Sequence, residues 1–204
     1  MYIVWHGHAC FTFVSEAGTL VIDPYQDDYV PGLSPLRLVA DQVLCSHDHK
    51  DHAARQTVTI TDRPHEFQIE TIPCFHDDQQ GALRGTNLIH IITDNGLRVA
   101  HLGDLGCPLT QEQIDQLQNL DALLIPIGGY YTIDAAQAQA IVEQLNPRVV
   151  IPMHYRTDEF GYDVLATRDE FLRLRGNAVY YAGNRFHLTG NNRVQTAALS
   201  YHPN

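Results

Sequence analysis

Short apolar runs separated by turn residues fill the first half of the chain. The runs are rich in β-branched and aromatic residues and therefore predict β-strands; they lie at residues 3–5, 10–14, 19–22, 42–45, 56–60, 67–72, 88–93 and 97–101. A hairpin is expected at Asp94-Asn95-Gly96, because Asn-Gly accepts the positive φ angles of a tight turn. This half of the molecule should be mostly β-sheet.

The spacing of apolar residues becomes helical after Pro108. Thr110 and Gln113 have the spacing of a capping box in front of a helix. Further helices are expected at 134–145 and 164–174, alternating with strands at 123–126, 148–152 and 178–181. Strands first and strand–helix alternation later are typical of a layered α/β protein, and we expect one domain over residues 1–204.

The composition narrows the choice of partners. Of the 204 residues, 44% are hydrophobic and 18% charged, as in globular proteins, and the formal net charge is −11. That charge argues against nucleic acid or an anionic membrane as the main partner, since both call for concentrated Lys and Arg. A small-molecule substrate is the expectation that remains, and the sequence leaves the oligomeric state open.

Neither a membrane span nor a disulfide framework is predicted. The N-terminus has no basic region before an apolar stretch, and no run of 18 apolar residues occurs. Four cysteines, none in a Cys-x-x-Cys spacing, favour free thiols in a reducing cytoplasm; they are Cys10, Cys45, Cys74 and Cys107.

The most informative segment is Ser46-His47-Asp48-His49-Lys50-Asp51-His52, which directly follows the apolar run at 42–45. His47 and His49 are two residues apart, so at the end of an extended strand they project to the same side. Asp51 and His52 follow where the chain must turn. One ion cannot easily accept four donors from so short a stretch, whereas two adjacent ions can share them. The segment therefore predicts a metal site, and the lack of cysteine in it argues against a purely structural zinc site.

His-x-His-x-Asp-His after a buried strand resembles the signature of the metallo-β-lactamase superfamily. The chain also contains the later residues of that signature in the same order, each near the end of an apolar run: His76, Asp104 and His154. Asp23, which closes the run at 19–22, matches the early aspartate of the family. The resemblance implies an α/β fold, a four-layer αββα sandwich, over nearly the whole chain.

The resemblance also implies a ligand set. The first metal would be held by His47, His49 and His76, and the second by Asp51, His52 and His154. Asp104 would bridge the two metals, and Asp23 would hold the metal loop by hydrogen bonds without touching a metal. For the third ligand of the first metal, His90 and His101 compete with His76, because His76 follows His52 closely and has no glycine before it.

Three further segments resemble the compact branch of the superfamily that contains the ascorbate-6-phosphate lactonase. They are Trp5-His6-Gly7-His8-Ala9, the stretch 81–87 and the stretch 126–132. Candidate substrate-binding residues follow from their places near these motifs and ligands, namely His8, Arg84, Tyr130 and Arg156. For each of them an ordinary structural or surface role is the alternative.

The resulting prediction is a binuclear metal-dependent hydrolase. Two divalent ions, Zn²⁺ first and Mn²⁺ or Fe²⁺ as alternatives, would supply a bridging hydroxide that cleaves an ester, lactone or phosphoester bond. Asp51 and Asp104 would be the catalytic carboxylates. The competing hypotheses are a di-iron redox protein and a non-enzymatic metal-binding module on the same scaffold.

Overall fold

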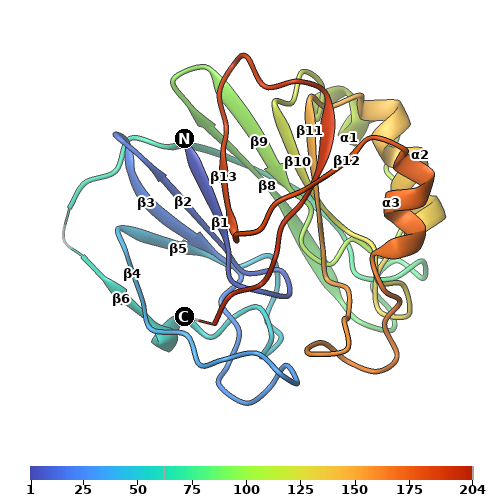
Figure 1. Ribbon diagram of the computed structural model, residues 1–204, viewed down its shortest axis with the longest axis horizontal. Coiled ribbons are helices and arrows are strands. Elements are labelled where there is room, and N and C mark those ends of the chain that lie inside the picture. The colour runs from blue at the N-terminus through green and yellow to red at the C-terminus, as the bar shows by residue number, and fades with distance from the viewer. Residues whose placement is uncertain (62, 204) are drawn as a thin grey trace.

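In the computed structural model, which describes residues 1–61 and 63–203, two large β-sheets lie face to face (Figure 1). The first sheet has the strand order β13 (Arg185–His187), β1 (Tyr2–Trp5), β2 (Phe11–Ser15), β3 (Gly18–Ile22) and β5 (Gln42–Leu44). The second has the order β12 (Ala178–Tyr180), β14 (Gln195–Ala198), β11 (Val149–Met153), β10 (Ala122–Pro126), β9 (Leu97–His101), β8 (Thr86–Asp94) and β7 (Gln68–Phe75). A small parallel pair, β4 (Leu38–Ala40) and β6 (Val58–Ile60), lies beside the first sheet.

The helices cover the seven-stranded sheet on its outer side (Figure 1). They are α1 (Gln111–Gln116), α2 (Ala135–Leu145) and α3 (Asp169–Arg175). Within the described residues no α-helix covers the other sheet, where the 3₁₀ turn η1 (Arg55–Thr57) and the β4–β6 pair are found. The predicted sandwich of two sheets is confirmed; among the described residues, α-helices cover the seven-stranded sheet, and only η1 and the β4–β6 pair lie on the other sheet.

One continuous apolar core fills the space between the sheets. It contains side chains of both, among them Phe11 and Phe13 from the first sheet and Ile89 and Leu124 from the second, each fully buried. All residues of the parallel neighbours β10 and β11 are buried. Such strands have no solvated face, which explains their unbroken apolar sequences.

Several local sequence signals are confirmed. Thr110 and Gln113 form the reciprocal capping box of α1, and a second one, Asp134 with Gln137, starts α2. Asn95 and Gly96 both have positive φ angles, 49° and 77°, in the hairpin between β8 and β9.

The expected helix over 164–174 is shorter, because its first part forms a turn followed by an isolated β-bridge. Arg156 pairs in parallel with Thr167, and the Arg156 N–H donates to the Ala166 carbonyl, so this stretch is bonded to the loop after β11. α3 begins only at Asp169. The run at 56–60 is likewise split, since residues 55–57 form η1 before β6 begins.

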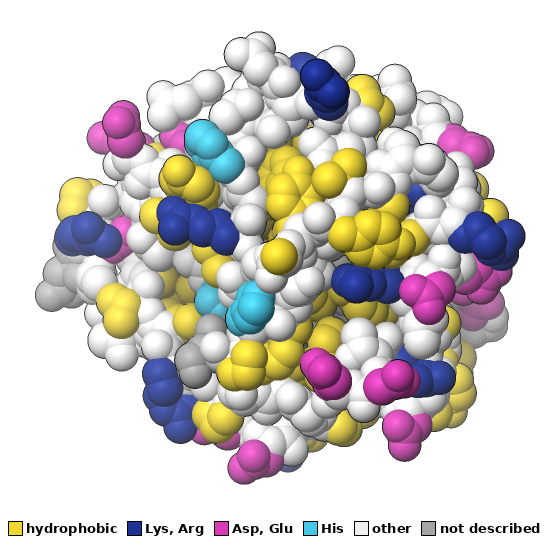
Figure 2. Space-filling model, viewed as in Figure 1, with side chains coloured by type: hydrophobic (Ala, Val, Ile, Leu, Met, Phe, Trp, Pro, Cys, Tyr) yellow, Lys and Arg dark blue, Asp and Glu magenta, His cyan; other side chains and the backbone are white. Residues whose placement is uncertain are grey.

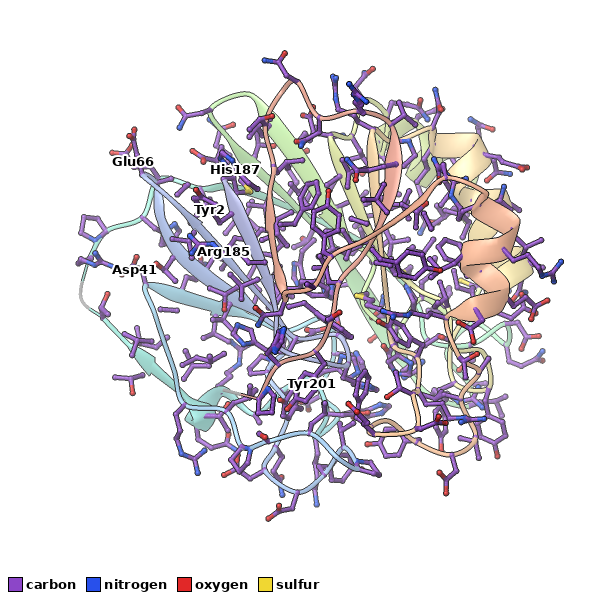
Figure 3. All side chains as sticks on the ribbon, viewed as in Figure 1. Tyr2, Asp41, Glu66, Arg185, His187 and Tyr201 are labelled. Atoms are coloured by element: carbon purple, nitrogen blue, oxygen red, sulfur yellow. The ribbon has the colours of Figure 1, made fainter. Side chains whose placement is uncertain are left out.

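Three strands were not expected: β4, β13 and β14. β13 lies antiparallel to β1, with Tyr2 opposite His187. The His187 ring stacks on Tyr2 with centroids 4.4 Å apart, and the Arg185 guanidinium lies 3.8 Å above the same ring (Figure 3). These cross-strand contacts stabilise a strand of only three residues that has little apolar pattern of its own.

Lys and Arg side chains are scattered singly, rather than gathered in one patch, on the face of the molecule shown in Figure 2. Among the described residues, no helix has both the length and the apolar character that a membrane crossing requires. The four cysteines are unpaired, with Cys10 and Cys74 buried.

Candidate metal centre

The predicted metal-binding residues follow the carboxyl ends of four strands. The segment 46–52 leaves β5, His76 follows β7, Asp104 follows β9 and His154 follows β11. Strands β7, β9 and β11 run in the same direction within the second sheet, so their carboxyl ends reach the same edge. The fold thereby brings together residues that are more than a hundred positions apart in the sequence.

The residues form two groups around one carboxylate. In the first group are His47, His49 and His76; in the second are His8, Asp51, His52 and His154. In each group, one candidate ligand atom per residue lies within 4.8 Å of all the others.

Asp104 lies between the two groups. Its Oδ2 atom is 3.2 Å from Nε2 of both His52 and His154, and 3.3 Å from Nε2 of His76. Nε2 of His47 is 4.0 Å away. Asp104 Oδ1 and His52 Nε2 are buried and have no hydrogen-bond partner among the described residues. These buried atoms have lone pairs that could bind a metal and that no hydrogen bond satisfies. Divalent cations beside Asp104 would satisfy them, because buried polar atoms in proteins normally have partners.

Asp23 orients the first histidines of the segment. It is fully buried and accepts hydrogen bonds from the Ser46 N–H and Oγ–H, both at 2.6 Å, and from His52 Nδ1 at 2.9 Å. Because the Ser46 hydroxyl donates to Asp23, we assign it as acceptor from His47 Nδ1–H, at 2.9 Å. With a cation bound, both histidines would carry their proton on Nδ1 and present the Nε2 lone pair to the centre.

Charge and burial set the protonation states that a cation needs. Burial and the neighbouring His52 lower the pKa of His47 to about 3, and burial and other neighbours lower that of His76. Burial alone would raise the pKa of Asp104, but His154 and His52 hold it well below its usual range. His52 is the exception, because Asp104, Asp51 and Asp23 outweigh its burial and raise its pKa. The centre without metal therefore combines buried carboxylates with the neutral imidazoles of His47 and His76, which favours a cation.

His76, rather than either competitor, lies beside His47 and His49. His90 and His101 use ring nitrogens in backbone contacts: His90 Nε2 lies 3.1 Å from the Cys45 carbonyl, and His101 Nε2 lies 2.9 Å from that of Ala9. Neither belongs to a candidate ligand group found among the described residues.

The loop that carries Asp104 is fixed from two sides. Asn87, fully buried, accepts from the Asp104 N–H at 2.9 Å and donates to the Leu102 carbonyl at 2.9 Å. Gly103 has φ +55°, and a Cβ there would lie 2.4 Å from Asn87 Oδ1 and 2.5 Å from Ser46 Cβ. Only glycine at position 103 leaves room for Ser46.

His8 does not occupy the place expected of a substrate-binding residue. Its side chain has no exposed surface, and it lies behind Asp51 rather than along the pocket over the centre. His8 Nε2 is 3.3 Å from Asp51 Oδ2. The sequence marks His8 only as a histidine that follows a glycine at a strand end. The fold shows that it lies with Asp51, His52 and His154 in the second group.

An open pocket of about 410 Å³ leads to the centre. Beside the candidate ligands it is lined by Tyr29, Asp48, Lys50, Arg84, Tyr131 and Tyr162. The Tyr162 hydroxyl lies 3.4 Å from Asp51 Oδ2, and burial and Asp51 raise the pKa of this phenol. Tyr162 thus stays a hydrogen-bond donor. This role of Tyr162 could not be predicted from the sequence, because a tyrosine in a loop carries no motif.

Arg84 is placed at the pocket by a loop that Asp77 organises. The Asp77 carboxylate accepts four backbone N–H bonds, from Gln79, Gly81, Leu83 and Arg84, at 2.7–3.0 Å. These bonds outweigh the effect of burial and lower the pKa of Asp77. The Arg84 guanidinium lies 5.6 Å from the Tyr131 ring centre, over its face.

The structure does not place Tyr130 or Arg156 along the pocket. Tyr130 is 65% exposed, and its neighbour Tyr131 lines the pocket instead. Arg156 donates from Nε to the Leu165 carbonyl at 2.8 Å, which ties its side chain to the loop after β11. Position next to a motif was the only signal for both residues, and it does not determine the direction of a side chain.

Comparison with known proteins identifies the family. A family model described as the beta-lactamase superfamily domain matches residues 2–154. A UPF0173 metal-dependent hydrolase of Thermoplasma acidophilum is 28% identical over 88% of this chain and 92% of its own. Another, of Archaeoglobus fulgidus, is 31% identical over 77% of this chain and 84% of its own.

Solved structures agree. A candidate zinc-dependent hydrolase of the metallo-β-lactamase superfamily from Thermotoga maritima is 32% identical, with a TM-score of 0.79 over 98% of this chain and 99% of that one. A metallo hydrolase of Ignicoccus hospitalis, 22% identical, has the same fold, with a TM-score of 0.63 over 84% of this chain and 88% of that one.

The chain therefore belongs to the metallo-β-lactamase superfamily and has its fold. Within the superfamily, it aligns over most of their length with proteins named metal-dependent hydrolases. The narrower resemblance to the ascorbate-6-phosphate lactonase stays a prediction.

Proposed function

We propose that this protein is a binuclear metal-dependent hydrolase that cleaves an ester, lactone or phosphoester bond in a small anionic substrate. The observation that supports it most is the position of Asp104 Oδ2, within 3.3 Å of imidazole nitrogens from both ligand groups. A carboxylate so placed is suited to hold two cations side by side.

In this proposal His47, His49 and His76 hold the first metal, and Asp51, His52 and His154 hold the second. Asp104 bridges them. Zn²⁺ suits the three-histidine group, and Mn²⁺ or Fe²⁺ would also accept these donors. The sequence prediction of a single domain working in the cytoplasm is kept as part of the proposal.

Two bound divalent ions would supply a hydroxide at neutral pH and stabilise the negative oxygen of the transition state. In ester cleavage, the water oxygen bonds to the carbonyl carbon and the bond to the leaving oxygen breaks. The proton that the water loses passes through Asp51 Oδ2 to that leaving oxygen. Tyr162, 3.4 Å from the same Oδ2, donates a hydrogen bond at this point of the site.

Arg84 and Lys50 favour an anionic substrate. Both line the pocket, and each lies over a tyrosine ring, Arg84 over Tyr131 and Lys50 over Tyr29. The same lining contains the carboxylates of Asp48, Asp51 and Asp104, so without metal it has one more negative than positive charge. Two bound divalent ions would make the pocket positive, and Arg84 and Lys50 would add to that field at the entrance.

The deciding experiment is metal analysis of the purified protein, followed by an activity screen with that metal restored. We expect two equivalents of divalent metal and turnover of an ester, lactone or phosphodiester, lost with a chelator and regained with metal. Metal binding without turnover on the whole panel would favour the non-enzymatic module, unless both bound ions are iron, which together with the absence of hydrolysis would favour the redox protein.

Arg84→Met should weaken the binding of anionic substrates. Loss of one charged hydrogen-bond donor is expected to raise KM roughly 10- to 100-fold, with little change in kcat. The measurement is steady-state kinetics on a substrate pair that differs only in its charged group. An equal rise in KM for the uncharged member would contradict a role in anion binding.

Tyr162→Phe should lower kcat by about 10²-fold with metal content unchanged, as expected when one preorganised donor is lost. Tyr29→Phe is the matched comparison, because it removes a hydroxyl from the same pocket without a contact to Asp51. A Tyr162→Phe enzyme as active as the Tyr29→Phe enzyme would remove Tyr162 from the mechanism.

A further inference from the structure

We propose that His8 is a ligand of the second metal, which would then have five protein donors. This inference rests on the proposed binuclear function and adds a residue from the turn between β1 and β2. One ligand atom of His8 lies within 4.8 Å of the ligand atoms of Asp51, His52 and His154, and the closest approach, to Asp51 Oδ2, is 3.3 Å.

Within residues 1–61 and 63–203, the His8 side chain has its polar contact with this group. Its side chain has no exposed surface, and Nδ1 has no hydrogen-bond partner among the described residues. The ring lies against other members of the group, with centroids 4.0 Å from His154 and 5.3 Å from His52.

The backbone holds His8 in this place at a conformational cost. His8 has φ +50°, which few non-glycine residues adopt and which tends to occur at functional sites. Its carbonyl accepts from Trp5 Nε1 at 3.0 Å and from the His154 N–H at 3.2 Å. The turn is therefore bonded directly to another residue of the second group. His154 itself has φ +53°.

With His8 included, the two metals have unequal donor sets. The first would have three imidazoles and the bridging Asp104, a set that suits four-coordinate zinc. The second would have His8, His52 and His154 with the carboxylates of Asp51 and Asp104. Five protein donors favour an ion that accepts five or six ligands, such as Mn²⁺ or Fe²⁺, over tetrahedral Zn²⁺.

The competing explanation is that His8 only donates a hydrogen bond to Asp51. His8→Gln separates the two, since an amide can still donate to Asp51 but is a poor metal ligand. We expect its second-metal Kd to rise at least about 100-fold, above the usual loss for a hydrogen-bond partner of a ligand, while the first-metal Kd stays unchanged. Binding is followed by isothermal titration calorimetry, with His90→Gln as the control for a buried histidine outside both groups.

A measurement on the wild-type protein keeps the test independent of variant folding. In metal-loaded protein labelled with ¹⁵N-histidine, a ligating Nε2 of His8 carries no proton, whereas a donor to Asp51 shows a one-bond N–H coupling. A protonated Nε2, or wild-type affinity for the second metal in His8→Gln, overturns the proposal. If wild-type protein itself binds only one metal, the binuclear function fails first, and the titration shows this before any variant is compared.

Discussion

Replacing Asp104 with alanine should abolish turnover and strip the protein of its second metal. Among the described residues, only the Asp104 carboxylate lies within 3.3 Å of imidazoles from both ligand groups. Its removal therefore leaves each proposed metal a ligand short, with no carboxylate between the two metals. We expect kcat/KM to fall at least about 10³-fold, which corresponds to about 4 kcal/mol of transition-state stabilisation. Metal content by mass spectrometry and kinetics on the substrate found in the screen are the measurements.

Asp48→Ala is the matched control for metal content. Asp48 lies between His47 and His49 in the sequence and lines the same pocket, but it belongs to neither ligand group. It should retain two metals. An Asp104→Ala protein that keeps both metals and full activity would contradict the binuclear scheme, whatever the control does.

Asp23→Ala should destabilise the fold strongly. The change leaves His52 Nδ1 and the Ser46 N–H and hydroxyl without their partner in a site with no exposed surface. Breaking a buried, hydrogen-bonded charge of this kind typically costs about 3–5 kcal/mol. Denaturant unfolding of the metal-free protein measures the free energy, and titration of the loaded protein should show metal affinity reduced by about 10- to 100-fold.

Asp41→Ala separates the loss of stability expected for Asp23→Ala from the loss of metal affinity. Asp41, labelled in Figure 3, is a buried carboxylate at the other end of β5, where it accepts from the Thr19 N–H at 2.8 Å and pairs with Arg63. Its loss should lower stability but leave the metal affinity of the folded protein unchanged. Equal losses of metal affinity in both variants would show that Asp23 acts only through general stability.

Much of the fold could be predicted, because apolar spacing and turn chemistry are local. The unbroken apolar runs of β10 and β11 and the capping residues of α1 and α2 carry their own signals. β13 and β14 could not be found this way. β13 is held by cross-strand contacts with Tyr2, and β14 lies between β12 and β11, so both depend on partners far away in the sequence.

The candidate ligands could be predicted from the sequence, because a metal site needs particular residue types, several of them close together in the chain. The choice of His76 over His90 and His101 needed the fold, since only the structure shows that the ring nitrogens of the latter two contact backbone. The roles of His8 and Tyr162 were beyond the sequence for a related reason. His8 reaches Asp51 because the turn that carries it has a positive φ angle at this residue. Tyr162 reaches Asp51 from a loop that contains no recognisable motif.

The loop organised by Asp77 limits which molecules the pocket can hold. His76 is next to Asp77 in the chain, and the carboxylate of Asp77 fixes the backbone of Arg84 through its N–H. The proposed anion anchor and a proposed metal ligand are therefore carried by one hydrogen-bonded loop, so the distance between their backbones is held and only the Arg84 side chain can adjust to the molecule that enters. A substrate must place its charged group within reach of that side chain while its scissile bond lies at the metals, and homologous molecules several bonds longer or shorter should be poor substrates.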